Sequence, residues 1–338
     1  MNPNLAVIIL AAGKGTRMKS DKAKVLHEVF FLPMIHHVLA AAAPLQAGRT
    51  LVIVGHQRQA VSAAIAGFKT ETVVQEEQLG TGHAVLLTEK AIPPDTAEVM
   101  ILCGDTPLLR PQSLTAMLAH HRASGAACTL MTTNLADPYG YGRVLTSSDR
   151  KVVKIVEEKD ATSEQKAIRT INTGIYLVRR GPLFTALASV DRNNAQGEFY
   201  LTDIVEKIVQ SGQIVEEFAN PDPDEVLGVN SRVELALAHA EIQRRRNRDL
   251  MLSGVSMEQP ESIAVALSAH VEPDCVLEPG VRLLGKTSLG RGCRIGQGAI
   301  LTDCQIGEKC QIGVYSCLTG VTLASGTRTR VGDCNQAR

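Results

Sequence analysis

The feature that most constrains the fold is an aliphatic residue that recurs every six positions after Pro260. The spacing holds, with a single one-residue slip, at Val271, Leu277, Leu283, Leu289, Ile295, Leu301, Ile306, Ile312 and Leu318. Glycine and other small residues are frequent between these positions. A six-residue period is typical of a parallel β-helix, in which each triangular coil uses three hexads and points an aliphatic side chain inward on every face. We expect three to four coils, close to the minimum that stacked repeats need for stability.

The cysteines follow the same period. Four of them lie two residues before an aliphatic hexad position: Cys275, Cys293, Cys304 and Cys310. Because free cysteine behaves as a small hydrophobe, we expect these four to fill interior corners rather than to bind metal or carry redox chemistry. The chain has no CxxC pair and no secretory signal at its N-terminus, so neither a zinc site nor a disulfide framework is expected.

Between Leu5 and Cys128 the chain alternates short apolar runs with amphipathic stretches. Strands are predicted at residues 5–10, 51–54, 99–103 and 127–131, and helices at 35–47, 57–66, 82–90 and 111–123. Strand and helix in repetition predict an α/β doubly wound, mostly parallel sheet with right-handed crossovers. Ligands of such sheets bind beyond the carboxyl ends of the strands, so the loops after Leu10 and Cys103 are the first candidates for a site.

Composition excludes two classes of partner. The 35 basic and 35 acidic residues balance, which favours binding neither to nucleic acid nor to an anionic membrane. No apolar run is long enough to span a bilayer, and the 44% hydrophobic content supports a sizeable core. We interpret the basic run at 244–246 as a solvated helix face and expect a cytoplasmic protein.

A glycine-rich loop, Leu10-Ala-Ala-Gly-Lys-Gly-Thr-Arg17, follows the first predicted strand. Its successive N–H groups can cradle phosphate oxygens, Arg17 adds charge, and Lys24 lies within reach. The spacing is neither that of a P-loop nor the dinucleotide fingerprint, because Met18 stands where the third glycine would be. The loop alone is compatible with a phosphate site and with a tight turn that carries two solvent-facing bases.

The loop together with Lys24 resembles the G-x-G-T-R…K signature of sugar nucleotidyltransferases, and most of all the N-terminal uridylyltransferase half of the bacterial bifunctional GlmU family. Further matches follow in the family's order over essentially the whole chain: Gln75, Gln78-Leu-Gly-Thr-Gly-His83, Gly104-Asp105-Thr-Pro107, Tyr141-Gly-Arg143, Ile155-Val-Glu157-Glu-Lys-Asp160, Ile171-Asn-Thr-Gly174, Asn194-Ala-Gln-Gly-Glu-Phe-Tyr-Leu-Thr-Asp203 and Gly228-Val-Asn230. The resemblance implies a sugar-phosphate nucleotidyltransferase domain over 1–230, a linker helix over 231–252 and a partial left-handed β-helix over 253–338.

The resemblance implies Mg²⁺-assisted transfer of uridylyl from UTP to N-acetylglucosamine-1-phosphate, which gives UDP-N-acetylglucosamine and pyrophosphate. The attacking phosphate has a second pKa of about 6 and is largely ionised at neutral pH, so no general base is needed. Positioning and charge neutralisation would then supply the catalysis. The resemblance also implies a homotrimer.

Residue roles are likewise implied by the resemblance. Arg17 and Lys24 are the expected catalytic groups, and Asp105 and Asn230 are the expected magnesium ligands, which also touch substrate. The other expected substrate-binding residues are Leu10, Ala11, Ala12, Gly13, Gln75, Gly80, Thr81, Cys103 and Gly104 on the nucleotide side and Gly142, Glu157 and Asn172 on the sugar side. A glutamine amide such as that of Gln75 can both donate and accept, which suits the edge of uracil. We expect His83 to have a structural role.

Two departures from the family pattern matter. Cys103 replaces a residue that is commonly tyrosine, so a side-chain contact there would be lost. Beyond position 250 the chain has one histidine, His270, and two lysines, Lys286 and Lys309. We therefore expect the acetyltransferase activity of the full-length family to be absent from this polypeptide.

Two alternatives compete with uridylyl transfer. Thymidylyl transfer onto glucose-1-phosphate is disfavoured because those relatives usually read Leu-Ala-Gly-Gly and Pro-Lys where this chain has Ala12 and Ala23. A catalytically silent UDP-sugar-binding or trimeric scaffold protein is disfavoured, because such a protein would be expected to have lost one of four residues that are all present here: Arg17, Lys24, Asp105 and Asn230.

Overall fold

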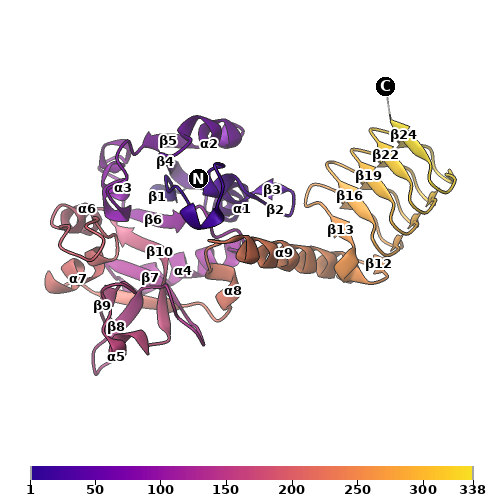
Figure 1. The fold of residues 1–338 in the computed structure, drawn as a ribbon. Coiled ribbons are helices and arrows are strands. Elements are labelled where there is room, and N and C mark those ends of the chain that lie inside the picture. The colour runs from indigo at the N-terminus through magenta and orange to yellow at the C-terminus, as the bar shows by residue number, and fades with distance from the viewer. Residues whose placement is uncertain (1, 337–338) are drawn as a thin grey trace. The chain divides into compact units, whose positions relative to one another are not determined.

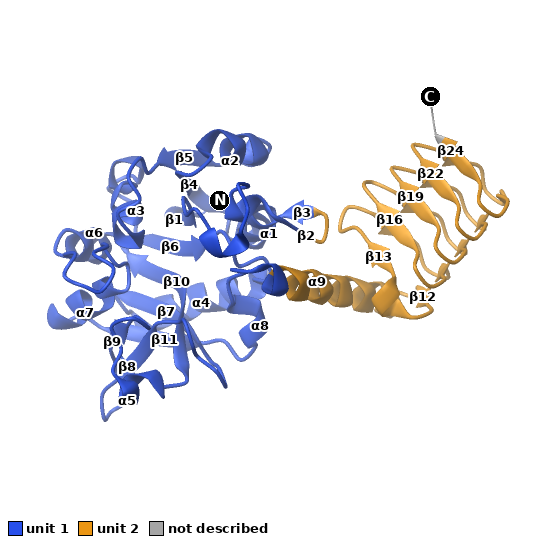
Figure 2. Ribbon diagram, viewed as in Figure 1, with its two compact units in different colours: residues 1–28, 32–234 blue, residues 29–31, 235–338 orange. Residues whose placement is uncertain are grey.

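The structure is a computed structural model that describes residues 2–336 (Figure 1). It divides into two compact units (Figure 2). Unit 1 comprises residues 1–28 and 32–234, and unit 2 comprises residues 29–31 and 235–338. Within residues 2–336, no helix combines the length and the apolar character that a bilayer span requires.

Unit 1 is built on a nine-stranded sheet. Seven strands form its main path in the order β11-β7-β10-β6-β1-β4-β5: β11 (Val215–Ala219), β7 (Cys128–Asn134), β10 (Thr170–Arg179), β6 (Glu98–Cys103), β1 (Asn2–Ala11), β4 (Ala47–Val54) and β5 (Glu71–Val74). The neighbours pair in parallel except β10, which runs antiparallel to both β6 and β7. A short ribbon of β8 (Arg143–Thr146) and β9 (Val152–Val156) joins through β10. A short separate pair consists of β2 (Glu28–Val29) and β3 (Leu32–Pro33).

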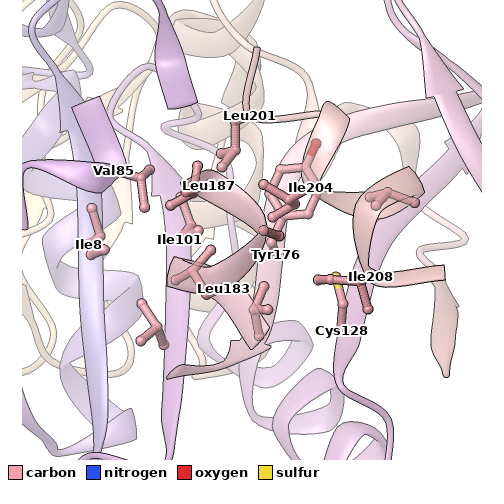
Figure 3. Packing of buried hydrophobic residues seen from close by; sticks show 14 of the residues in the cluster. Ile8, Val85, Ile101, Cys128, Tyr176, Leu183, Leu187, Leu201, Ile204 and Ile208 are labelled. Carbon is pink, nitrogen blue, oxygen red and sulfur yellow. The ribbon is translucent and has the colours of Figure 1, made fainter. Parts of the chain in front are cut away.

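Helices cover both faces of the sheet. They are α1 (Met34–Ala42), α2 (Arg58–Ile65), α3 (Thr81–Leu86), α4 (Pro111–Ser124), α5 (Ser163–Lys166), α6 (Arg180–Leu187), α7 (Asp203–Gln210) and α8 (Pro223–Val226). One core holds Ile8 and Ile101 against α3, α6 and α7 (Figure 3). The other holds Val7 and Ile9 against α1, α2 and α4. The central strand is thus buried on both faces, which explains its uninterrupted apolar run.

The predicted α/β doubly wound fold is confirmed, and the four predicted strands correspond to β1, β4, β6 and β7, of which β7 begins one residue later than predicted. The helix predicted over 35–47 is shorter than expected. α1 ends at Ala42, and a 3-10 turn over Ala43–Leu45 follows. Pro44 explains the change, because proline has no N–H to continue the α-helical hydrogen bonds.

Unit 2 contains most of α9 (Arg232–Leu252) and a β-helix of three parallel sheets. The first sheet contains β12 (Ser256–Met257), β15 (Val276–Leu277), β18 (Arg294–Ile295) and β21 (Gln311–Ile312). The second contains β13 (Ala264–Val265), β16 (Arg282–Leu284), β19 (Ile300–Thr302), β22 (Cys317–Thr319) and β24 (Cys334–Gln336). The third contains β14 (His270–Val271), β17 (Ser288–Leu289), β20 (Gln305–Ile306) and β23 (Thr322–Leu323).

The β-helix predicted from the six-residue period is confirmed, and all nine hexad positions are buried. Its sheets hold four, five and four strands, so the described part has four coils and one further strand. This slightly exceeds the predicted count, because the first coil begins at Ser256, before the first residue of the counted series. The one-residue slip shortens one corner. In the first sheet Val276 pairs with Arg294, which is 18 residues further along the chain. Arg294 pairs with Gln311, which is only 17 residues further along.

The four interior cysteines lie at buried corners, as predicted. The thiols of Cys275, Cys293 and Cys310 donate to backbone carbonyls at sulfur–oxygen distances of 3.2, 3.0 and 3.2 Å. The carbonyls belong to residues 14 or 15 positions further along the chain. These side chains therefore contribute packing and hydrogen bonds between coils.

We expect Leu289→Ala to lower the free energy of unfolding of unit 2 by about 2–5 kcal/mol, because Leu289 is fully buried between coils and its truncation leaves a cavity. Leu267→Ala is the matched control, since Leu267 is 43% exposed and should change stability by less than about 0.5 kcal/mol. Chemical denaturation, monitored by amide hydrogen exchange in residues 256–336, measures the free energy of unfolding of both variants. Equal effects of the two substitutions would contradict the inward assignment of the hexad positions.

Candidate active site

The glycine-rich loop leaves the sheet at the carboxyl end of β1. Gly15 has φ +62°, and a Cβ atom there would lie 2.6 Å from Cβ of Lys24. Glycine is therefore required at this position both by backbone conformation and by space. The consequence is that Lys24 packs directly against the loop, as the sequence predicted it could.

A cavity of about 460 Å³ opens at this edge of the sheet. Of the predicted site residues its wall includes Leu10, Ala11, Ala12, Gly13, Arg17, Lys24, Gln75, Gly80, Thr81, Cys103, Asp105 and Asn230. Gly104 lies at the same strand end but is buried against β1, where its N–H donates to the Leu10 carbonyl at 2.9 Å. Residues distant in sequence thus meet where parallel strands end.

The charged centre of this cavity joins Lys24, Asp105 and Asn230. The Lys24 ammonium contacts Oδ2 of Asp105 and donates to Oδ1 of Asn230 at 2.6 Å. Arg17 Nη2 donates to the same Asn230 oxygen at 2.7 Å. Two oxygens from separate segments therefore converge on one cationic group.

The position of Asn230 is set by the start of α9. Ser231 and Glu234 form a reciprocal capping box: the Ser231 N–H donates to Glu234 Oε2 at 2.8 Å, and the Glu234 N–H donates to Ser231 Oγ at 3.2 Å. The N–H of Val229 donates to the Asp105 carbonyl at 2.8 Å and ties this segment to the end of β6. Sequence reasoning missed the capping box, although the Ser-x-x-Glu spacing at 231–234 is its signature.

Gln75 and the loop at Gly80 form the other wall. The buried Gln75 amide donates to the Gly80 carbonyl at 3.0 Å and lies 3.2 Å from Nδ1 of His83, in α3. The segment that contains Phe199, which was not among the predicted site residues, packs closely against this loop. A Cβ atom on Gly80 would lie 2.5 Å from the Phe199 carbonyl oxygen. The Leu201 N–H also donates to Oγ1 of Thr81 at 3.0 Å.

Gly142, Glu157 and Asn172, predicted for the sugar, lie outside the wall of this cavity but next to one another. The Asn172 N–H donates to the Gly142 carbonyl at 2.9 Å. A Cβ atom on Gly142 would lie 3.5 Å from Oε2 of Glu157. Thr202, which was not predicted, donates its hydroxyl to Oε1 of Glu157 at 3.1 Å. Burial raises the pKa of Glu157, while the Thr202 hydrogen bond partly opposes that shift.

A buried arginine, Arg143, supports the residues next to the predicted sugar-binding group of Gly142, Glu157 and Asn172. Arg143 donates to Oε2 of Glu158 at 2.7 Å and also contacts the Tyr141 carbonyl. It therefore holds the residues that flank Gly142 and Glu157. Arg143 was noted only as part of the Tyr-Gly-Arg motif, and its near-complete burial is a property that the motif did not reveal.

Cys103 lies at the end of β6, where its thiol approaches the Gly174 carbonyl at 3.6 Å. Burial raises the pKa of this thiol to about 12, the Asp105 charge adds to the shift, and the Lys24 charge opposes it. Cys103 is consequently a neutral thiol at pH 7, and it fills space at the wall of the cavity.

Comparison with known proteins agrees with this geometry. A family model of the MobA-like NTP transferase domain matches residues 7–194. The bifunctional protein GlmU of Desulfotalea psychrophila is 52% identical over 324 residues, which cover 96% of this chain and 95% of that protein. The chain belongs to the GlmU family. The GlmU protein of Pelobacter propionicus is 46% identical over 93% of this chain and 69% of its own length.

Membership in the GlmU family confirms the predicted resemblance and makes the chain a nucleotidyltransferase of the UDP-N-acetylglucosamine diphosphorylase type. The fold has a further counterpart in a solved Bacillus anthracis structure, provisionally named a glucose-1-phosphate thymidylyltransferase and determined with sucrose. It superposes with a TM-score of 0.56 at 20% identity and covers 70% of this chain and 94% of that one. At that identity the likeness concerns the fold alone.

We expect Gly15→Ala to lower kcat/KM for nucleotidyl transfer about 10- to 100-fold, because the added Cβ atom displaces Lys24 and the backbone is strained. Gly181→Ala is the matched control, since a Cβ atom at Gly181 meets nothing within 4 Å. Pyrophosphate release measures both variants. Unchanged kcat/KM in a folded Gly15→Ala protein would contradict the assignment of Lys24 and its loop to the active site.

Proposed function

We propose that this chain transfers the uridylyl group of UTP to N-acetylglucosamine-1-phosphate and releases pyrophosphate. The observation that carries the proposal is the convergence of Arg17, Lys24, Asp105 and Asn230 in a cavity whose wall is the glycine-rich loop. Two cations and a row of backbone N–H groups suit a triphosphate. The membership in the GlmU family supports the identity of the two substrates.

Asp105 and Asn230 are the residues that we propose hold Mg²⁺. The arrangement of these two side chains suits a cation, since Oδ2 of Asp105 and Oδ1 of Asn230 both contact the positively charged ammonium group of Lys24. Oxygen ligands of this kind, completed by phosphates and water, are those that Mg²⁺ prefers. When bound, Mg²⁺ would neutralise phosphate charge. The ammonium of Lys24 would then be available to the phosphates.

The chain's own residues supply positioning and charge. The loop at 10–13 orients the phosphates through backbone N–H groups, and Arg17 and Lys24 stabilise the charge that develops on the α-phosphate and on pyrophosphate. Gln75, Gly80 and Thr81 would contact the uracil, and Gly142, Glu157 and Asn172 the N-acetylglucosamine ring. The sugar phosphate attacks as an already ionised nucleophile, so no residue needs to remove a proton.

The decisive experiment measures pyrophosphate release with UTP and N-acetylglucosamine-1-phosphate, with Mg²⁺ and with EDTA. Parallel reactions contain dTTP and glucose-1-phosphate. We expect release only from the first pair, its loss in EDTA, and a fall of at least about 100-fold in kcat for Asp105→Ala. Asp149→Ala, at an exposed aspartate of unit 1, is the matched control and should retain activity.

Three outcomes would overturn parts of this proposal. Faster pyrophosphate release from dTTP and glucose-1-phosphate would show that the substrates are different. Full activity in EDTA would show that the reaction does not need Mg²⁺. Folded protein that is silent in every reaction, yet binds UDP-N-acetylglucosamine in calorimetry, would favour the silent binding or scaffold protein.

We further infer that unit 2 associates in threes and that this polypeptide does not acetylate glucosamine-1-phosphate. Exposed apolar side chains such as Leu252 and Tyr315 on unit 2 support the first inference. For the second, the one histidine after position 250, His270, is exposed and pairs with Glu272 at 2.6 Å.

Sedimentation at working concentration tests the trimer, and a species at 36.2 kDa would rule it out. The same preparation, given acetyl-CoA and glucosamine-1-phosphate, should release no coenzyme A. Steady release above that of a boiled sample would contradict the second inference.

A further inference from the structure

Two cysteines of the β-helix differ from all the others. Cys317, in β22, and Cys334, in β24, are exposed, whereas Cys103 is half-buried and the remaining five are buried. Cys317 and Cys334 are also direct register partners in parallel strands. The coil geometry therefore places two free thiols side by side on the surface.

The spacing of paired strands suits a bond between these thiols. Adjacent strands lie about 4.8 Å apart, and registered residues leave a sheet on the same side. A disulfide requires Cα atoms about 4.4–6.8 Å apart. Because both side chains are exposed, they share the outer side of the sheet, and a bridge can form while β22 and β24 remain paired.

The coil that such a bridge would close is the least covered of the described β-helix. Over residues 2–335, Leu318 is the last buried residue, and Val331 is 73% exposed. β24 pairs with β22 as its one strand neighbour among the described strands. Among the described residues, little apolar burial holds this coil, and a covalent link across it would restrict its opening.

We propose that Cys317 and Cys334 form a reversible disulfide in the presence of a peroxide, and that this bond clamps the coil between them. One thiolate attacks a peroxide oxygen, the O–O bond breaks, and a sulfenic acid forms. The second thiolate attacks that sulfur, the S–O bond breaks, and the S–S bond forms. For hydrogen peroxide, two thiols are oxidised and two waters leave. A cellular thiol such as glutathione can restore both cysteines by exchange.

The interior cysteines are separated from this chemistry by burial. Cys275, Cys293 and Cys310 lie inside the coils and donate to carbonyls. The Cys103 thiol has a pKa raised to about 12 by burial, which suppresses the reactive thiolate. Exposure therefore distinguishes Cys317 and Cys334 from the interior cysteines, which keep the packing role that the sequence predicted.

The test treats the purified full chain with hydrogen peroxide and compares it with the reduced protein. We expect the intact mass to fall by two hydrogens and peptide mapping to find the 317–334 bridge. Before oxidation, iodoacetamide should label these two thiols and spare the others. Amide exchange between residues 318 and 333 should slow about tenfold or more in the oxidised protein and recover with glutathione.

Cys317→Ser and Cys334→Ser should each abolish the bridge, whereas Cys103→Ser should retain it. Disulfide-linked dimers, stable sulfinic acid, a bridge at other cysteines, or unreacted thiols in folded protein would each overturn the disulfide. A 317–334 bridge with unchanged amide exchange would overturn the clamp.

Discussion

Burial of the central strand on both faces is the constraint on which unit 1 depends. Each residue of β1 from Leu5 to Ile9 is buried, and alternate side chains enter the two cores. Such a strand can satisfy its backbone only by pairing on both edges, as it does with β4 and β6. At its carboxyl end the chain leaves the sheet through the small residues of the glycine-rich loop, which line the cavity.

The same edge of the sheet concentrates charge. Lys24 meets an aspartate 81 residues away and an asparagine 206 residues away, and Arg17 joins the second contact. A group of this kind is held by its surroundings: the end of β6 fixes Asp105, and the capping box of α9 fixes Asn230. In the proposed reaction, donors and acceptors held in place in this way would stabilise phosphate charge without a general base.

The segment around residues 194–202 links two groups of predicted site residues. Phe199 and Leu201 brace the loop of Gly80 and Thr81, and the adjacent Thr202 donates to Glu157. One short segment thus orders both the proposed base-binding wall and the proposed sugar-binding group. In unit 2 the corresponding order comes from stacking, where each coil covers the aliphatic residues of the previous one and the last described coil has the least cover.

Local patterns in the sequence determined a large part of this description. The six-residue period predicted the β-helix and its inward residues, the apolar runs predicted β1, β4, β6 and β7, and the glycine loop predicted the position of Lys24. These predictions succeed because periodicity and turn chemistry act over a few residues. The family motifs added Asn230 and the sugar-side residues, whose roles no spacing could give.

Only the tertiary structure decided which distant residues meet. Thr202 against Glu157, the burial of Arg143 and the bracing of Gly80 by Phe199 all depend on strand order and crossover paths, which a local pattern does not encode. The pairing of Cys317 with Cys334 depends on the strand register, because a coil longer by a single position would place Asn335 opposite Cys317 instead. The step from Cys317 to Cys334 is 17 residues, one fewer than the 18-residue step from Arg282 to Ile300, so the length of this one coil determines which two thiols face each other.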